Sequence, residues 1–148
     1  MIKDKLTPKD KELILKDISS RFPISIKIKV RTQWFDTEKE EIFYRYDDRT
    51  ISSYEELKSI RVEDFRPYLF PISSMTLAQV DELFSTLSKD IGIDWSNNNC
   101  SFINCSEEEG VPIEDVLNAI EWFNKNHIDY RGLIKKKLAF DATGLNIY

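Results

Sequence analysis

The chain has 148 residues, of which 41% are hydrophobic and 32% charged, and its formal net charge is −5. This length fits one domain, and the ordinary apolar content excludes a chain that is disordered throughout. No apolar run approaches the ~20 residues of a membrane-spanning helix, and two cysteines are too few for a disulfide framework. We therefore expect a single soluble, cytoplasmic domain over residues 1–148 with free thiols.

The charge is distributed unevenly along the chain. Residues 1–35 carry nine basic and four acidic side chains, residues 36–121 seven and twenty, and residues 122–148 five and two. The overall acidity argues against general nucleic-acid binding, for which a basic domain is typical. Two alternatives stay open: the basic ends neutralise the acidic middle, or they form a local basic patch together.

The first thirty residues predict a helix and then a strand. Thr7 can cap a helix and Pro8 suits its first position, so we expect a helix over residues 8–21. In residues 24–31, isoleucine and valine alternate with polar and basic residues, which predicts a strand with one buried face and Lys27 and Lys29 facing solvent.

The middle of the chain predicts further strands and a second helix. Residues 41–46 form a second strand, Asp47-Asp48-Arg49 its turn, and residues 50–53 the opening of a third strand. Residues 54–66 fit either one helical turn at 54–57 or a short strand at 61–65. Thr76 and Gln79 then form a capping box. The helix that it opens shows an apolar face and should end at Gly92; that face comprises Val80, Phe84, Leu87 and Ile91.

The last third predicts a polar loop, a third helix and a docked tail. Residues 94–110 are polar and should form a surface loop. Pro112 opens a helix whose expected apolar face comprises Ile113, Val116, Leu117, Ile120 and Phe123. Residues 129–148 are too apolar to remain in solvent, so we expect this tail to pack against the rest of the fold. Together these elements predict an α+β fold, with a small antiparallel sheet packed against about three main helices.

Motifs for metals and cofactors are absent from the sequence. A zinc site built on Cys100 and Cys105 needs two further ligands, and His127 is the only histidine in the chain. The acidic stretch around residues 107–115 lacks the spacing of a calcium loop, and there is no glycine-rich phosphate loop. We therefore expect no metal and no cofactor.

Two segments are candidates for function. The cluster His127, Asp129, Tyr130 and Arg131 could run acid–base chemistry or hold a phosphate, or it could simply close a helix and cap the next turn. Residues 67–75 form an apolar loop between prolines, whose Tyr68, Phe70 and Met75 could meet a partner at low entropic cost. The same loop could instead fill one end of the core.

Three segments of the chain are distinctive: Pro67-Tyr68-Leu69-Phe70-Pro71-Ile72-Ser73-Ser74-Met75-Thr76, residues 127–134, and residues 138–148. These segments resemble a group of uncharacterised proteins from phages, prophages and other mobile elements of gut Bacteroidales. The resemblance also covers the start at Leu6-Thr7-Pro8-Lys9-Asp10, whereas residues 32–60 depart from the more β-rich, glycine-containing middle of that group. It implies a setting on a mobile element and no particular activity.

These observations favour a non-enzymatic protein-binding module that acts on a host or phage protein. The alternative is a small enzyme or nucleotide-binding protein that uses the His127–Arg131 cluster. A third hypothesis is weak nucleic-acid binding through Lys27, Lys29 and Arg31, which the overall acidity disfavours. The sequence leaves the oligomeric state open.

Overall fold

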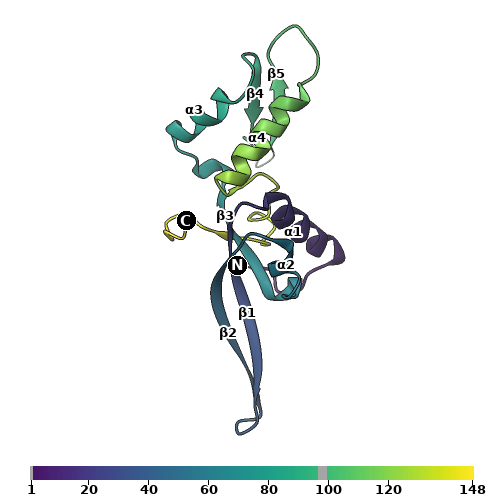
Figure 1. The fold of residues 1–148 in the computed structure, drawn as a ribbon, viewed down its shortest axis with the longest axis vertical. Coiled ribbons are helices and arrows are strands. Elements are labelled where there is room, and N and C mark those ends of the chain that lie inside the picture. The colour runs from purple at the N-terminus through teal and green to yellow at the C-terminus, as the bar shows by residue number, and fades with distance from the viewer. Residues whose placement is uncertain (1, 97–99) are drawn as a thin grey trace.

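The computed structural model describes residues 2–96 and 100–148, and its α+β architecture confirms the expected fold class (Figure 1). The main sheet has the strand order β2-β1-β3-β6, with β7 also paired to β3, and β4 and β5 form a small second sheet. The main sheet is mixed and not purely antiparallel, because β6 and β7 run parallel to β3. The main elements are α1 (Pro8–Arg21), β1 (Ile26–Asp36), β2 (Glu41–Ile51), α2 (Tyr54–Leu57), β3 (Phe65–Pro71), α3 (Leu77–Ser85), β4 (Ile91–Asp94), β5 (Ser101–Asn104), α4 (Ile113–Lys125), β6 (Ile128–Asp129) and β7 (Phe140–Asp141).

Helix α1 and strand β1 build the first core, as the sequence predicted. The Thr7 hydroxyl accepts a hydrogen bond from the Asp10 amide, and the Asp10 carboxylate accepts one from the Thr7 amide, so α1 begins with a capping box. The isoleucines and valine of β1 pack against α1, while Lys27 and Lys29 on the other face are half-buried. Each buried aliphatic side chain contributes roughly 1.5–3 kcal/mol. The fully buried members of this cluster include Ile14, Ile18, Ile26, Ile28 and Leu69.

A second hydrophobic cluster lies at the other end of the molecule. It joins α3, α4 and β4, which Figure 1 shows on the side of β3 opposite the β1–β2 hairpin. Its buried members are Ile72, Leu83, Ile93, Ala119, Trp122, Phe123 and Ile128. The two clusters are connected by β3, by the residues around β6 and by a contact between α4 and α1, in which the Asn124 side chain donates a hydrogen bond to the Ser20 carbonyl. This junction joins the two ends of the fold.

The β1–β2 hairpin is longer than predicted. The predicted turn at Asp47-Asp48-Arg49 is wrong, since these residues belong to β2, which continues to Ile51. Aspartate is unusual inside a strand, but Asp48 lies opposite Lys29, and its carboxylate accepts a hydrogen bond from the Tyr68 hydroxyl. The turn falls instead at residues 37–40. There the Asp36 carboxylate accepts hydrogen bonds from the backbone amides of Glu38 and Lys39.

No third strand opens at residues 50–53. Residues 50 and 51 complete β2, and a single helical turn, α2, follows at Tyr54–Leu57. Residues 62–64 form a 3-10 turn instead of a strand, and β3 begins only at Phe65. Of the two interpretations of residues 54–66, the helical turn is therefore confirmed.

Helix α3 is shorter than predicted. It has the expected capping box at Thr76 but ends at Ser85, and Ile91 and Gly92 lie in β4. The Asp115 carboxylate accepts hydrogen bonds from the amide and hydroxyl of Ser88, which fixes the chain in a turn after the helix. Within the polar stretch 94–110, residues 101–104 form β5, while residues 97–99 lie outside the described residues.

Helix α4 packs through only part of the predicted face. Phe123 is buried as predicted, and Val116 and Ile120 are half-buried, but Ile113 and Leu117 are 76% and 57% exposed. Ala119 and Trp122, which were not predicted to face the core, are buried, so the buried side of α4 is shifted from the predicted one.

The C-terminal tail docks, which confirms that expectation. Leu138, Ala139 and Ala142 are buried, and β7 pairs with β3. The Tyr148 hydroxyl donates a hydrogen bond to the Tyr68 carbonyl at 2.7 Å and accepts one from the Lys27 amide at 3.0 Å. The last residue is thus fastened to the main sheet.

Candidate functional site

The segment from Pro67 to Met75 was expected to be a loop, but residues 67–71 lie in β3 and residues 72–74 form a 3-10 turn. Tyr68 is 3% exposed in β3, and its hydroxyl donates to the Asp48 carboxylate at 2.7 Å. Burial and this hydrogen bond raise the pKa of Tyr68. The Phe70 ring lies 5.7 Å from the Tyr148 ring, and Met75 packs on the second cluster. Tyr68 is buried, whereas Phe70 and Met75 are half-buried against the second cluster.

Asp129 holds the turn that follows β6. Its buried carboxylate accepts hydrogen bonds from the amides of Leu133 at 2.9 Å and Ile134 at 2.8 Å. Gly132 has a φ of 75°, a conformation that glycine adopts without strain. Burial raises the pKa of Asp129, although the two amide hydrogen bonds oppose this rise. The carboxylate is therefore engaged as a cap and does not point to open solvent.

Tyr130 and Arg131 belong to a buried ionic network with α1. Arg21 donates two hydrogen bonds to Asp17, at 2.9 and 3.1 Å, and one to the Ile128 carbonyl at 2.8 Å. The Arg131 Nε lies 3.3 Å from the Asp17 carboxylate. Both guanidinium groups lie over the Tyr130 ring, at 5.2 and 5.1 Å from its centre. The network joins α1 to the junction between the two clusters.

His127 is held as a neutral side chain. Its φ of 58° is unusual for a residue other than glycine or asparagine, and its ring stacks on Tyr148 at 3.7 Å between centroids. Burial, together with the nearby Arg21 charge, lowers the pKa of His127 to about 4. General acids and bases work best when their pKa lies near the working pH. A pKa near 4 is far from pH 7, so His127 does not meet this condition. The cluster from His127 to Arg131 thus has the geometry of a structural junction.

This lowered pKa makes stability depend on pH in a defined direction. An unfolded histidine takes up a proton near pH 6.5, whereas folded His127 does so only near pH 4. Acidification from pH 6.5 to 4 therefore protonates the unfolded state preferentially, so the contribution of His127 is present above pH 6.5 and is lost on acidification. After allowance for solvent screening at this half-buried site, we expect a loss of about 1–2 kcal/mol.

The variant His127→Asn isolates this effect, because asparagine tolerates a positive φ and does not titrate. Denaturant titrations at pH 7 and pH 4.5 should show a larger fall in the free energy of unfolding for the wild type than for the variant. Other titrating groups, Asp129 among them, contribute to both proteins alike. Parallel pH profiles for the two proteins would contradict the account.

A cleft of about 290 Å³ lies beside the basic face of β1. Its cations are already engaged: Arg31 pairs with Asp64 at 3.2 Å, and Lys29 lies 4.9 Å from the centre of the Phe140 ring. The buried Arg66 guanidinium donates to the backbone carbonyls of Val62, Phe65 and Lys3. Carboxylates also line this cleft, namely Asp4, Glu63 and Asp64. This charge balance gives little support to binding of a polyanion.

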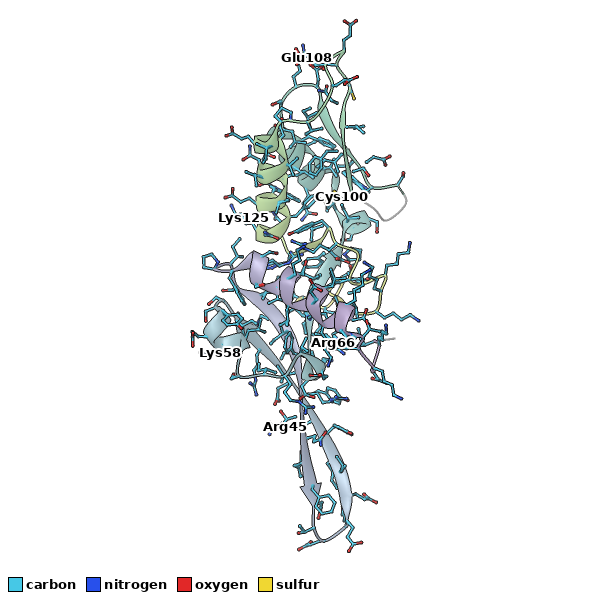
Figure 2. The ribbon with its side chains drawn as sticks, turned by 90° about the vertical axis from the view of Figure 1, so that its right-hand side faces the viewer. Arg45, Lys58, Arg66, Cys100, Glu108 and Lys125 are labelled. Atoms are coloured by element: carbon cyan, nitrogen blue, oxygen red, sulfur yellow. The ribbon has the colours of Figure 1, made fainter. Side chains whose placement is uncertain are left out.

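The hairpin formed by β1 and β2 carries several exposed large apolar side chains. Figure 1 shows it projecting beyond the body of the molecule, and Figure 2 places Arg45 on the projecting part. The register pairs Phe35 with Ile42, Gln33 with Tyr44 and Arg31 with Tyr46, so the four large apolar side chains share one face with Gln33 and Arg31. We name this surface the apolar hairpin face; it consists of Phe35, Ile42, Tyr44 and Tyr46, which are 57%, 53%, 49% and 58% exposed.

The opposite face of the hairpin has a structural explanation. Trp34 lies across from Phe43, and their rings stack at 5.8 Å between centroids. Lys39 covers the Phe43 ring at 5.5 Å. Such cross-strand aromatic pairs stabilise a two-stranded ribbon. On the apolar hairpin face, the Arg31 guanidinium lies over the Tyr44 ring, 5.2 Å from its centre, but no two aromatic rings stack there among the described residues.

Sequence reasoning missed this surface. The sequence predicts strands only at residues 24–31 and 41–46, and this prediction does not bring the aromatic residues of 33–46 together on one surface. The available signal was the run Ile42-Phe43-Tyr44-Arg45-Tyr46, in which aromatic side chains occupy both faces of a strand too far from the core to bury either. When apolar side chains occupy both faces of a two-stranded ribbon that projects from the core, no element covers them and they form an exposed apolar surface.

Among the described residues, no group of three His, Cys, Asp or Glu side chains is arranged to hold a metal ion, and no helix has both the length and the apolar character needed to cross a membrane. Cys100 and Cys105 are free, and burial raises the pKa of the Cys100 thiol to about 11. The thiol of Cys100 therefore stays protonated at neutral pH. Comparison with known protein families, curated proteins and solved structures gives no match to this chain.

Proposed function

We propose that the chain is a non-enzymatic protein-binding module and that the apolar hairpin face is its recognition surface. The observation that carries this proposal is the exposure of four large side chains, each about half accessible, on one side of a projecting hairpin. Tyrosine and phenylalanine are over-represented in the centres of protein interfaces, because they bury much area at a small cost in side-chain entropy. A host or phage protein is the proposed partner.

The end of the hairpin specifies the chemistry of that partner. Residues 36–41 contain four carboxylates and one lysine. A complementary surface therefore has an apolar groove for the aromatic side chains and basic residues around the hairpin tip, since complementary charge speeds association and selects partners. The His127–Arg131 cluster supports the enzymatic alternative less well, because its carboxylate, guanidinium and ring are engaged inside the fold.

Site-directed photo-cross-linking in the cells that make the protein tests this proposal. A benzophenone amino acid at Tyr44 should give one discrete adduct with a different polypeptide. The matched control is Tyr54 in α2, which is 62% exposed and lies outside the hairpin. It should give no such adduct. Adding Phe35→Ser should reduce the Tyr44 adduct about tenfold, as expected for loss of an aromatic anchor. Equal adducts at both positions, or none at Tyr44, would contradict the proposal.

A further inference from the structure

The outer edge of β2 is a long and regular sheet edge. β2 pairs with β1 along all 11 of its residues in an unbroken register, from Ile26↔Ile51 to Asp36↔Glu41, so it contains no bulge. Within the described residues, no strand pairs with its other edge. Natural edges are commonly blocked by proline, lysine, bulges or short length, because open edges pair with other chains. β2 has no proline, no lysine and no bulge.

We propose that this edge pairs with β2 of a second copy of the chain, antiparallel and about a two-fold axis at Tyr46. Two identical strands pair antiparallel with symmetry only when the axis is perpendicular to the sheet. Side chains then keep their faces, and residues opposite each other must come from the same face of the hairpin. The axis must therefore pass through a residue of β2, and only a few registers are allowed.

Charge selects one of these registers. With the axis at Arg45 or at Asp47, like charges face each other at the centre, and an axis at Asp48 does the same. With the axis at Tyr44, Glu41 faces the second copy's Asp47. Like charges directly opposite in a sheet are destabilising, whereas opposite charges are favourable.

The axis at Tyr46 avoids every like-charge contact and pairs the whole strand. It places Glu41 opposite the second copy's Ile51, so all residues of β2 take part. It also places Arg45 opposite the second copy's Asp47, twice by symmetry. In one chain, Arg45 and Asp47 already lie 3.3 Å apart on one face, with Arg45 71% exposed. Pairing would convert this weak surface pair into a ring of four alternating charges.

This inference goes beyond the proposed function, because it uses the backbone edge of the hairpin and not its apolar face. The chain mass is 17.4 kDa, so analytical ultracentrifugation of the wild type should show a concentration-dependent species of twice that mass. Arg45→Asp and Asp47→Arg should each raise the dissociation constant about tenfold or more, since each places two pairs of like charges opposite each other.

An equal mixture of the two variants provides the decisive arm of the experiment. The Arg45→Asp variant has carboxylates at positions 45 and 47, and the Asp47→Arg variant has guanidinium groups at both. In the mixed dimer opposite charges therefore face each other again, and the dissociation constant should return to the wild-type value. The control Arg61→Asp changes the charge equally at a site that is 72% exposed and outside the hairpin, and should leave dimerisation unchanged. A monomeric wild type, a dimer indifferent to the single substitutions, or failure of the mixture to restore the dimer would each overturn the proposal.

Discussion

Replacement of Asp17 with alanine is expected to lower the free energy of unfolding by about 3–5 kcal/mol, the range for breaking a buried ion pair from one side. Asp17 and Arg21 are both fully buried, and Arg131 lies 3.3 Å from the same carboxylate. Removal of the carboxylate leaves the fully buried Arg21 guanidinium without its ion-pair partner and also removes the carboxylate beside Arg131, whose side chain is 22% exposed. Equilibrium urea unfolding measures this loss directly.

The matched control is an exposed ion pair with similar helical spacing. Glu55 pairs with Lys58 at 2.6 Å, and Glu55 is 76% exposed. Glu55→Ala should change stability by at most about 0.5 kcal/mol, because solvent screens exposed pairs. The double replacement Asp17→Leu with Arg21→Met should recover part of the loss, since a buried pair can be replaced by apolar side chains at little cost. A loss below about 1 kcal/mol for Asp17→Ala would show that the network does not hold the junction.

The elements that the sequence predicted well are those in which a local signal and burial agree. Helix α1 has its cap, its N-terminal proline and its buried face in the expected places. The alternating apolar residues of β1 face α1 as their period requires. In both cases the same few residues determine the local conformation and the core contacts. A sequence pattern that predicts the local conformation therefore also predicts which side chains are buried.

Strand β3 shows why other elements were missed. A proline inside a sequence argues against a central strand, because it has no amide proton to donate. Pro67 nevertheless pairs with Ile28 on one side, while pairing on the other side of β3 begins only at Tyr68. Pro67 thus precedes the first residue of β3 that pairs with β7, so no amide proton is required of it on that side. This arrangement depends on the C-terminal tail arriving as β7, which residues 65–71 alone do not specify.

The candidate site was missed for a related reason. Sequence reasoning placed Tyr68 and Phe70 on a loop because prolines flank them, and it assigned Tyr44 and Tyr46 to an ordinary strand. Exposure depends on how far a strand extends past the element that covers it, and β1 continues beyond its pairing with β3 at Val30. That length becomes visible only once the partner strands are in place.

Shortening the hairpin tests the central claim most directly. Deletion of residues 32–35 and 42–45 removes four residues from each strand, which preserves both the side-chain alternation and the hydrogen-bond alternation of the ladder. The native turn at residues 36–41 is kept. The deleted residues include Phe35, Ile42 and Tyr44, which are half exposed, and the stacked pair Trp34 and Phe43. None of these side chains belongs to either core cluster, and the stack stabilises only the part of the ribbon that is removed. We therefore expect stability to change by no more than about 1 kcal/mol.

The measurement is the amount of partner that co-purifies with the shortened protein from the cells that make it, relative to the full-length chain. We expect this amount to fall to background, while thermal unfolding stays cooperative. A full-length hairpin with Phe35→Thr, Ile42→Thr and Tyr44→Thr should behave like the shortened one, because the loss is assigned to side chains and not to length. Retention of the partner by a stably folded shortened protein would contradict the assignment of recognition to the hairpin.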